Sequence, residues 1–150
     1  MICIVQRVTQ AQVTVDDKIV GKIDRGLLVL AAVERGDDSA AAAWTANKLA
    51  TLRIFQNEEK HFDADIKQIA GSILLVSNFT VAAATRKGRR PSFDPAADPI
   101  DAEPIFNDLL NAIRAQNIPT ETGKFGAPML VSSINDGPAT FIIQTDAKND

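Results

Sequence analysis

The sequence is poor in the residues on which many enzyme sites depend: its 150 residues include one cysteine and one histidine. A single cysteine excludes an internal disulfide and suits a reducing compartment, so we expect a cytoplasmic protein. A Ser-His-Asp or Cys-His site could use only His61, and a zinc site of Cys and His ligands cannot be assembled within one chain. We therefore expect neither a metal nor another cofactor.

Long apolar runs are missing as well. No run reaches about 18 residues, so the sequence predicts no transmembrane helix and no membrane partner. The first seven residues lack a basic segment ahead of an apolar one and do not resemble a secretory signal. The net charge is −3, so a polyanionic partner would have to be held by a local basic patch.

The length and composition are typical of one globular domain over residues 1–150. We expect its tail, from 144 to 150, to be disordered. Apolar patterning predicts strands over residues 2–8, 11–15, 18–23, 27–33, 72–77, 129–134 and 139–143, the last two flanking a turn at 135–138. Helices are predicted from 39 to about 52, and from a cap at Asp101 to about 117. The interpretation is an α/β (α+β) domain in which two helices cover a mixed, mostly antiparallel, barrel-like sheet.

Basic residues are concentrated in one predicted loop. Four of the chain's 16 Lys and Arg residues occupy five positions, namely Arg86, Lys87, Arg89 and Arg90. Such a cluster in a net-acidic chain favours phosphate binding at least as strongly as a solvated loop. Phe93 and Phe125 could stack on a base, although a lone phenylalanine is more often part of a core.

Two residues with reactive side chains favour ordinary structural roles. His61 lies in a poorly patterned region with no identifiable partners, so a surface histidine is the favoured interpretation. Cys3 lies in the first predicted strand, where a free cysteine behaves as a small buried hydrophobe.

Several segments, in order along the chain, carry a resemblance to one family. They are Val5-Gln6-Arg7-Val8, Gly26-Leu27-Leu28-Val29-Leu30, Ser77-Asn78-Phe79-Thr80-Val81, the basic loop from Thr85 to Phe93, Thr122-Gly123-Lys124-Phe125-Gly126-Ala127, and Asn135-Asp136-Gly137-Pro138-Ala139-Thr140. From Met1 to about Ile143 the chain resembles the D-aminoacyl-tRNA deacylases, also called D-tyrosyl-tRNA deacylases. Asn78 departs from the family's glutamine, and Ala139 from a valine or larger residue.

The resemblance implies a homodimer with its active site at the subunit interface. It implies hydrolysis of the ester that joins a D-amino acid, or glycine mischarged on tRNA-Ala, to the 3′-terminal adenosine of tRNA, with rejection of L-aminoacyl-tRNA. The implied catalytic residues are Ser77, Asn78, Phe79 and Thr80. The resemblance assigns chiral selection to Gly137, Pro138 and Arg7, with a cis peptide between Gly137 and Pro138. It assigns tRNA binding to Arg86, Lys87, Arg89, Arg90 and Phe125.

The residues leave the catalytic device open. Thr80 is either a nucleophile or a group that positions water, and the sequence offers no evident base for it. We favour catalysis by the backbone N–H groups of Phe79 and Thr80, which can stabilise a tetrahedral oxyanion, with the vicinal 2′-hydroxyl of the tRNA helping to orient water. Two rival functions remain: a same-fold editor of L-type mischarged aminoacyl-tRNA, and a non-catalytic RNA-binding module.

Overall fold

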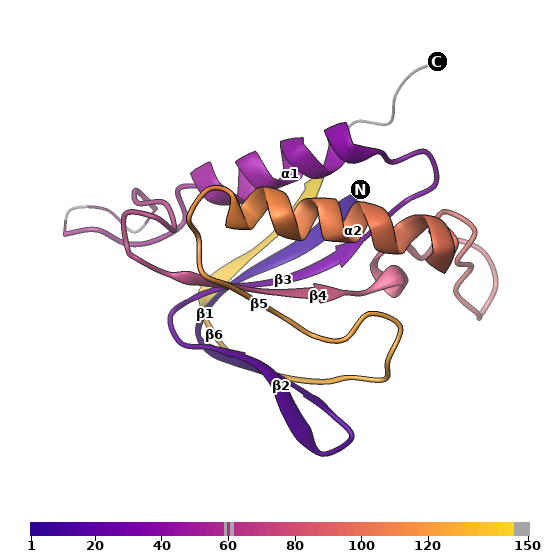
Figure 1. The fold of residues 1–150 in the computed structure, drawn as a ribbon, viewed down its shortest axis with the longest axis horizontal. Coiled ribbons are helices and arrows are strands. Elements are labelled where there is room, and N and C mark those ends of the chain that lie inside the picture. Colours follow the sequence, from indigo (N-terminus) through magenta and orange to yellow (C-terminus); the bar gives the residue numbers. More distant parts are fainter. Residues whose placement is uncertain (59, 61, 146–150) are drawn as a thin grey trace.

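Two helices lie side by side over one face of a curved mixed sheet (Figure 1). The computed structural model describes residues 1–58, 60 and 62–145, so His61 and the end of the tail lie outside the described residues. The helices are α1 (Ser39–Thr51), α2 (Pro99–Arg114) and the short 3₁₀ helix η1 (Phe79–Ala82). The strands are β1 (Ile2–Val15), β2 (Lys18–Ile23), β3 (Gly26–Ala32), β4 (Ser72–Ser77), β5 (Thr120–Thr122) and β6 (Leu130–Gln144).

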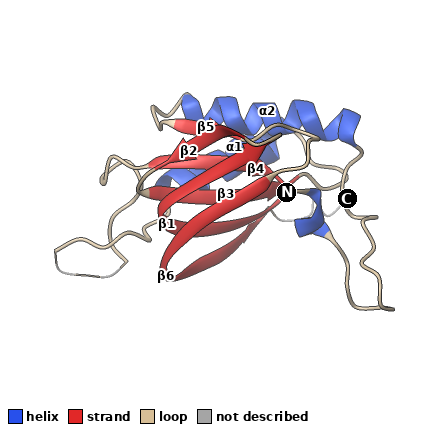
Figure 2. Cartoon of the chain, turned by 90° about the horizontal axis from the view of Figure 1, so that it is seen from below, coloured by secondary structure: helices blue, strands red, loops and turns tan. Residues whose placement is uncertain are grey.

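The long strand β1 organises the sheet. The strand order is β2-β1-β3-β4-β5, and β6 pairs along β1 as well. The β3–β4 and β4–β5 pairs are parallel, whereas β1 pairs antiparallel with β2, β3 and β6. Figure 2 shows the resulting curved sheet with both long helices on the same side. The expected α+β architecture, a mixed barrel-like sheet with two helices, is confirmed.

Two local features make the sheet curl. Asp16 and Asp17 both have positive φ (48° and 61°), as a two-residue turn that matches the strand twist requires, so β2 folds back directly on β1. A Cβ atom added to Gly21 of β2 would overlap the carbonyl oxygen of Thr122 in β5. Glycine at this position therefore allows β2 to approach β5 and nearly close the barrel.

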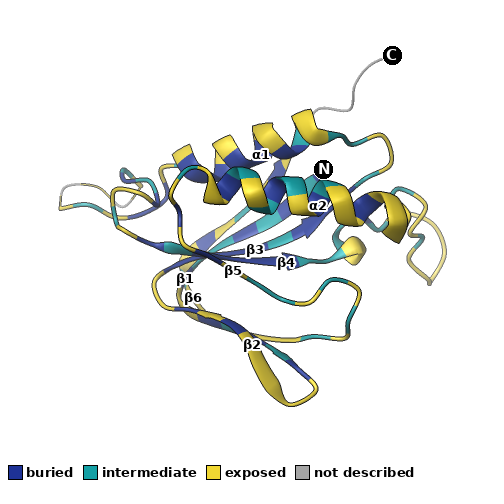
Figure 3. Ribbon diagram, viewed as in Figure 1, coloured by how far each residue is buried: buried dark blue, intermediate teal, exposed yellow. Residues whose placement is uncertain are grey.

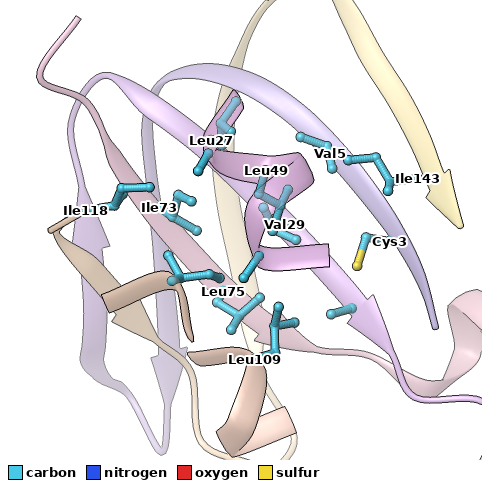
Figure 4. Close-up of a cluster of buried hydrophobic side chains, with 14 of the residues drawn as sticks. Cys3, Val5, Leu27, Val29, Leu49, Ile73, Leu75, Leu109, Ile118 and Ile143 are labelled. Atoms are coloured by element: carbon cyan, nitrogen blue, oxygen red, sulfur yellow. The ribbon is translucent and has the colours of Figure 1, made fainter. Parts of the chain in front are cut away.

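The curled sheet is buried on both faces, so the chain has two main cores. Between sheet and helices lie side chains such as Val29 and Leu75 from the strands and Leu49 and Leu109 from the helices (Figure 4). The opposite face of the sheet packs a second cluster inside the curl: Val8, Ala11, Val13, Val15, Ile23, Leu28, Leu74 and Val76. Figure 3 shows that β3 and β4 are mostly buried. Burial on both faces explains why their sequences are almost continuously apolar.

The two long helices agree with those predicted from the sequence, except at the start of α2. Residues 37–39 all offer caps in the sequence, and the structure uses Asp38, whose carboxylate caps α1 by accepting from the Ala41 N–H at 3.0 Å. The expectation that Asp101 caps the second helix was wrong: α2 begins at Pro99 after the cap residue Asp98 and ends at Arg114. Proline is well suited to a first helical turn because its missing N–H has no partner there anyway. In the described part of the chain no helix is long and apolar enough to cross a membrane.

The prediction of a turn at residues 135–138 was wrong, because this segment does not reverse the chain. Both flanking segments pair with β1 in one direction, as parts of the single strand β6. Asn135 lies opposite Val8 and Thr140 opposite Gln6, so four residues of β6 oppose one residue of β1. The Asp-Gly-Pro segment therefore forms a wide bulge rather than reversing the chain, because the long β1 offers pairing partners on both sides of it.

Candidate active site

The first group of predicted site residues lies where β4 ends. Ser77 is half-buried at the last strand position, paired with Ala31 of β3. The Asn78 N–H donates to the Ala31 carbonyl at 2.8 Å, and the chain then turns into η1. This short helix carries Phe79 and Thr80 to the surface, where both residues are exposed.

The Asn78 side chain caps η1 and fixes Thr80. Its Oδ1 accepts from the Thr80 N–H at 3.2 Å and from the Thr80 hydroxyl at 2.6 Å. A carboxamide is not a base, so this contact orients the hydroxyl without activating it. The sequence favoured two backbone N–H groups, those of Phe79 and Thr80, as oxyanion donors. The Thr80 N–H is already hydrogen-bonded to Asn78 Oδ1. The Phe79 N–H has no acceptor within the described residues.

An aromatic pair lies beside this turn. Phe79 is 57% exposed, and its ring meets the ring of Phe93 edge-on, with centroids 5.1 Å apart. Phe93 follows the basic loop, whose base is closed by two hydrogen bonds between Ala84 and Ser92 of 2.8 and 2.9 Å. The structure thus places the basic loop next to the end of β4.

The basic loop itself is exposed from Thr85 to Pro91. Its tip turns at Gly88, which has a φ of +74°, and all four of the cationic residues around it are exposed: Arg86, Lys87, Arg89 and Arg90. Phe125 lies apart from this loop in the sequence and is half-buried, with its ring 5.7 Å from that of Phe106 on α2. Phe93 is therefore the more open of the two phenylalanines singled out from the sequence.

The second group surrounds the bulge of β6. The Gly137–Pro138 peptide is cis, which confirms that expectation. The Arg7 guanidinium donates to the Asp136 carbonyl at 2.9 Å and to the Ile54 carbonyl at 2.7 Å, and lies 3.2 Å from the Asp136 carboxylate. The Arg7 side chain, 12% exposed, thus ties the bulge to the chain segment after α1.

Two residues outside the predicted set complete this support. Asn135 spans the bulge by donating from Nδ2 to the carbonyls of Arg7 (3.0 Å) and Ala139 (3.2 Å). Phe62 covers the Arg7 guanidinium, which lies 5.4 Å from its ring centroid. Asn135 stands in the motif and could have been singled out, but nothing in the sequence connects Phe62 with Arg7.

One chain does not bring the two groups together. The bulge lies opposite Arg7, which pairs with Leu27 near the start of β3, whereas Asn78 is bonded to Ala31 near its end. Four residue steps along a strand correspond to about 13 Å. A substrate that touches both groups must therefore span much of the sheet or meet the bulge of another subunit.

The environment of Cys3 disfavours the reactive thiolate form of its side chain. It is fully buried beneath the helices, and burial raises the pKa of its thiol from 9.0 to about 12. The thiolate is the nucleophilic form of cysteine, so the structural role expected for Cys3 agrees with its environment. In the described part of the chain, no three His, Cys, Asp or Glu side chains are grouped as potential metal ligands.

The fold is a known one. A solved structure named c-Myc DNA unwinding element binding protein superimposes on this chain with a TM-score of 0.92 and 34% identity, covering 98% of this chain and 100% of that one. The fold therefore places the protein in a class of α+β domains built on one curled sheet.

The particular family follows from the sequence comparisons. The family model described as D-Tyr-tRNA(Tyr) deacylase matches residues 4–144. The D-aminoacyl-tRNA deacylase of Geobacter sulfurreducens is 46% identical over 99% of this chain and 98% of its own length. That of Dichelobacter nodosus is 48% identical over 94% and 97%. The chain belongs to the D-aminoacyl-tRNA deacylase family and is a hydrolase, which confirms the family inferred from its motifs.

Proposed function

We propose that this protein hydrolyses D-aminoacyl-tRNA through the exposed backbone at the start of η1, and that a second copy of the chain supplies the group that rejects L-amino acids. The observation that carries the first half is the contact of the Thr80 hydroxyl with Asn78 Oδ1 at 2.6 Å. It leaves Thr80 without a base among the described residues, so water is the better candidate for the attacking group.

The chemistry requires a site for a developing negative charge. Water adds to the ester carbonyl carbon, and the carbonyl electron pair moves onto oxygen. The tetrahedral intermediate collapses with cleavage of the bond to the ribose oxygen, which takes up a proton originating from the water. The open Phe79 N–H can donate to the oxyanion at no reorganisation cost, and the vicinal 2′-hydroxyl of the substrate can orient the water.

We assign chiral selection to Gly137 and Pro138, with Arg7 holding their segment in place. Both residues of the pair are exposed, while the segment is held from within by Arg7 and Asn135. A rigid main-chain wall can exclude an L side chain more strongly than a pocket that merely fits a D side chain. Such a wall has nothing to exclude in glycine, so we propose that glycyl-tRNA, including glycine mischarged on tRNA-Ala, is also cleaved.

The exposed surface of β6 supports a homodimer. Six consecutive strand residues, Leu130–Asn135, are exposed, so neither face of this stretch is covered. Leu130 (71%), Ile134 (52%) and Ile142 (70%) expose much apolar surface on a strand that pairs only with β1 within the described chain. A two-fold partner that covers this strand would also bring its own bulge into the neighbourhood, giving two identical composite sites.

The tRNA is assigned to the loop that follows η1. Its four exposed cations lie beside the exposed rings of Phe79 and Phe93, and together they suit a phosphate backbone near an unpaired terminal base. We place the reaction in the cytoplasm, where aminoacyl-tRNA is used.

The substrate is tested with matched D-tyrosyl-tRNA, L-tyrosyl-tRNA and glycyl-tRNA. We expect cleavage of the D-form and the glycyl form, and survival of the L-form. Cleavage of the L-form alone would indicate the same-fold editor of L-type substrates. Binding of all three without release of amino acid would indicate a non-catalytic RNA-binding module.

The composite site is tested by complementation. Phe79→Pro removes the open N–H at a helix position that tolerates proline, whereas Phe79→Ala loses only the ring. Gly137→Val damages the other group. In a mixture of re-associated Phe79→Pro and Gly137→Val chains, half of the dimers are mixed and one of their two sites is intact, so we expect about one quarter of the wild-type activity. If each site belonged to one chain, the mixture would be no more active than its parents.

The dimer itself is tested by sedimentation. Ile134→Glu places a charge on the exposed part of β6, and we expect a monomer without activity. Ile100→Glu is the matched control, because Ile100 is 83% exposed at the start of α2. A fully active monomeric Ile134→Glu variant would overturn the inter-subunit site.

A further inference from the structure

The aromatic ring of Phe62 lies against the arginine that supports the bulge of β6, although Phe62 itself is 48% exposed. We propose that Phe62 is a positioning residue for chiral selection, because its ring keeps the Arg7 guanidinium in the orientation that supports the bulge. The inference rests on the proposed function, in which the segment at Gly137 rejects L-amino acids. It adds a residue from the chain between α1 and β4, where no sequence motif points to the site.

The segment after α1 contacts Arg7 twice. The Ile54 carbonyl accepts from Arg7 Nη1 at 2.7 Å, and the guanidinium carbon lies over the Phe62 ring, 5.4 Å from its centroid. Phe55 and Ala64 exchange two backbone hydrogen bonds of 3.0 Å, which pair the two arms of this segment. Ile54 lies on one arm and Phe62 on the other, so the carbonyl and the ring are presented to the guanidinium together.

The Phe62 ring also contacts the strand that carries the bulge. It meets the ring of Phe141 edge-on, with the centroids 6.1 Å apart and the ring planes at 86°. Phe141 lies three residues beyond Pro138 in β6. An edge-to-face pair of rings is stabilised beyond what its buried area alone provides. Phe62 therefore connects the strand of the bulge with the arginine that supports it.

The shape of a guanidinium explains why an aromatic ring suits this position. Arg7 donates to the Asp136 carbonyl at 2.9 Å and to the Ile54 carbonyl at 2.7 Å. The N–H groups of a guanidinium lie in its plane, and its flat faces stack on aromatic rings. The electron-rich face of a ring attracts the cation, whereas an aliphatic side chain only covers it. An aromatic residue at position 62 therefore restrains the guanidinium while both carbonyls are bound.

A role in packing alone does not account for this arrangement. Phe55, in the same segment, is fully buried in the core beneath the helices, whereas about half of Phe62 faces solvent. Replacing Phe62 by leucine removes little buried apolar surface, so the melting temperature should change little. The orientation of Arg7 should change more, because leucine has no ring face to attract the cation.

The first experiment compares side chains at position 62. We expect Phe62→Leu to raise kcat/KM for L-tyrosyl-tRNA roughly three- to fivefold relative to D-tyrosyl-tRNA, the factor that a half-exposed cation–π contact supplies. Phe62→Tyr and Phe62→Trp keep an aromatic face and should retain the wild-type ratio of D to L cleavage. Trp44→Leu is the matched control, because Trp44 is an aromatic residue of α1 with a similar exposure of 46%.

The second experiment needs no substrate. The Arg7 Nε–H donates to the Asp136 carbonyl, so its hydrogen exchange, followed by NMR, reports how often this contact with the bulge opens. Exchange should be faster in Phe62→Leu and should return to the wild-type rate in Phe62→Tyr. The melting temperature of each variant shows that it is folded.

A double-mutant cycle tests whether the effect passes through Arg7. Arg7→Gln removes the cation, so adding Phe62→Leu to it should change the ratio of D to L cleavage no further. An equal change in the wild-type and Arg7→Gln backgrounds would assign Phe62 to packing alone and overturn its positioning role. If Arg7→Gln does not fold, the exchange of the Arg7 Nε–H decides the question.

The outcomes distinguish this inference from the proposed function. Failure of the wild-type protein to cleave D-tyrosyl-tRNA would overturn the proposed function and this role with it. Selective cleavage by wild type, together with an unchanged D to L ratio or an unchanged exchange rate in folded Phe62→Leu, would overturn the role of Phe62 alone. A change in both measurements that is absent from Phe62→Tyr supports it.

Discussion

The end of β4 and the bulge of β6 are built by opposite means. At the end of β4 the decisive contacts join residues two apart, Asn78 and Thr80, in one local turn. At the bulge they join residues 129 positions apart, since Arg7 of β1 holds Asp136 of β6. A local turn can form wherever its sequence occurs, whereas the bulge depends on the whole sheet. The proposed catalytic group should therefore tolerate global destabilisation better than the proposed selective group.

The largest effect is expected at the bulge. A Cβ added to Gly137 would overlap Asn135 Oδ1, the side chain that spans the segment. Gly137→Val should therefore displace the proposed selective wall and lower kcat/KM for D-tyrosyl-tRNA by about 100-fold, the effect of misplacing a reacting group by about 1 Å. Ala43→Val, which adds a branched side chain at an exposed position of α1, is the control. Unimpaired Gly137→Val turnover would remove this segment from the site.

A smaller effect is expected behind the bulge. Arg7→Lys keeps the positive charge, but the lysine ammonium lacks the planar guanidinium that donates hydrogen bonds to the carbonyls of Ile54 and Asp136. We expect the free energy of unfolding to fall by about 1–2 kcal/mol, because at least one hydrogen bond of a mostly buried group is lost. Urea denaturation measures this change. Cleavage of L-tyrosyl-tRNA should rise in parallel, and an unchanged ratio of D to L cleavage would show that Arg7 supports only stability.

At the end of β4 the loss of a hydroxyl should be milder. Thr80→Ala keeps the backbone N–H that Asn78 Oδ1 holds and removes only the shorter contact. We expect kcat to fall about tenfold, because the proposed oxyanion donor, the Phe79 N–H, remains and only the turn that positions it is weakened. Single-turnover kinetics measure the step. Complete loss of deacylation in folded Thr80→Ala would instead support a hydroxyl nucleophile.

The basic loop should affect binding rather than chemistry. Its cations are exposed and form no ion pair within the described residues. Neutralising Arg89 and Arg90 to glutamine should raise KM and lower the slope of log affinity against log salt by about one unit per lost phosphate contact. Lys67→Gln, an exposed cation elsewhere, serves as the comparison. An unchanged slope would make the loop an ordinary solvated one.

The smallest effect concerns Cys3. Its thiol pKa of about 12 lies above the usual value, so at pH 8 the thiol is protonated and unreactive. We expect no alkylation by iodoacetamide and no loss of activity in the folded protein, and rapid alkylation in denaturant, as measured by mass spectrometry. Because the raised pKa disfavours the charged form, the folded state should lose stability only as pH rises past the ordinary thiol pKa of 9.0, at which the unfolded chain begins to ionise.

Residues near one another in the chain were largely predictable. The Asp38 cap of α1, the Asp16-Asp17 turn and the doubly buried strand after Gly26 follow from local propensity and apolar pattern. The cis peptide before Pro138 was expected from the family motif alone. The start of α2 was misplaced by three residues because Asp98, Asp101 and Pro99 all carry start signals, and local rules do not rank them.

The sequence by itself determined the chemistry available: one buried thiol, an acidic chain with one basic loop, and a motif with an amide next to Phe79 and Thr80. Only the tertiary structure decided how these groups are used. It turned the expected Asn-Asp-Gly-Pro turn into a bulge, because β1 is long enough to pair on both sides of it. It also separated Gly137 from Thr80 along the sheet, since register depends on contacts between distant strands that no local pattern encodes.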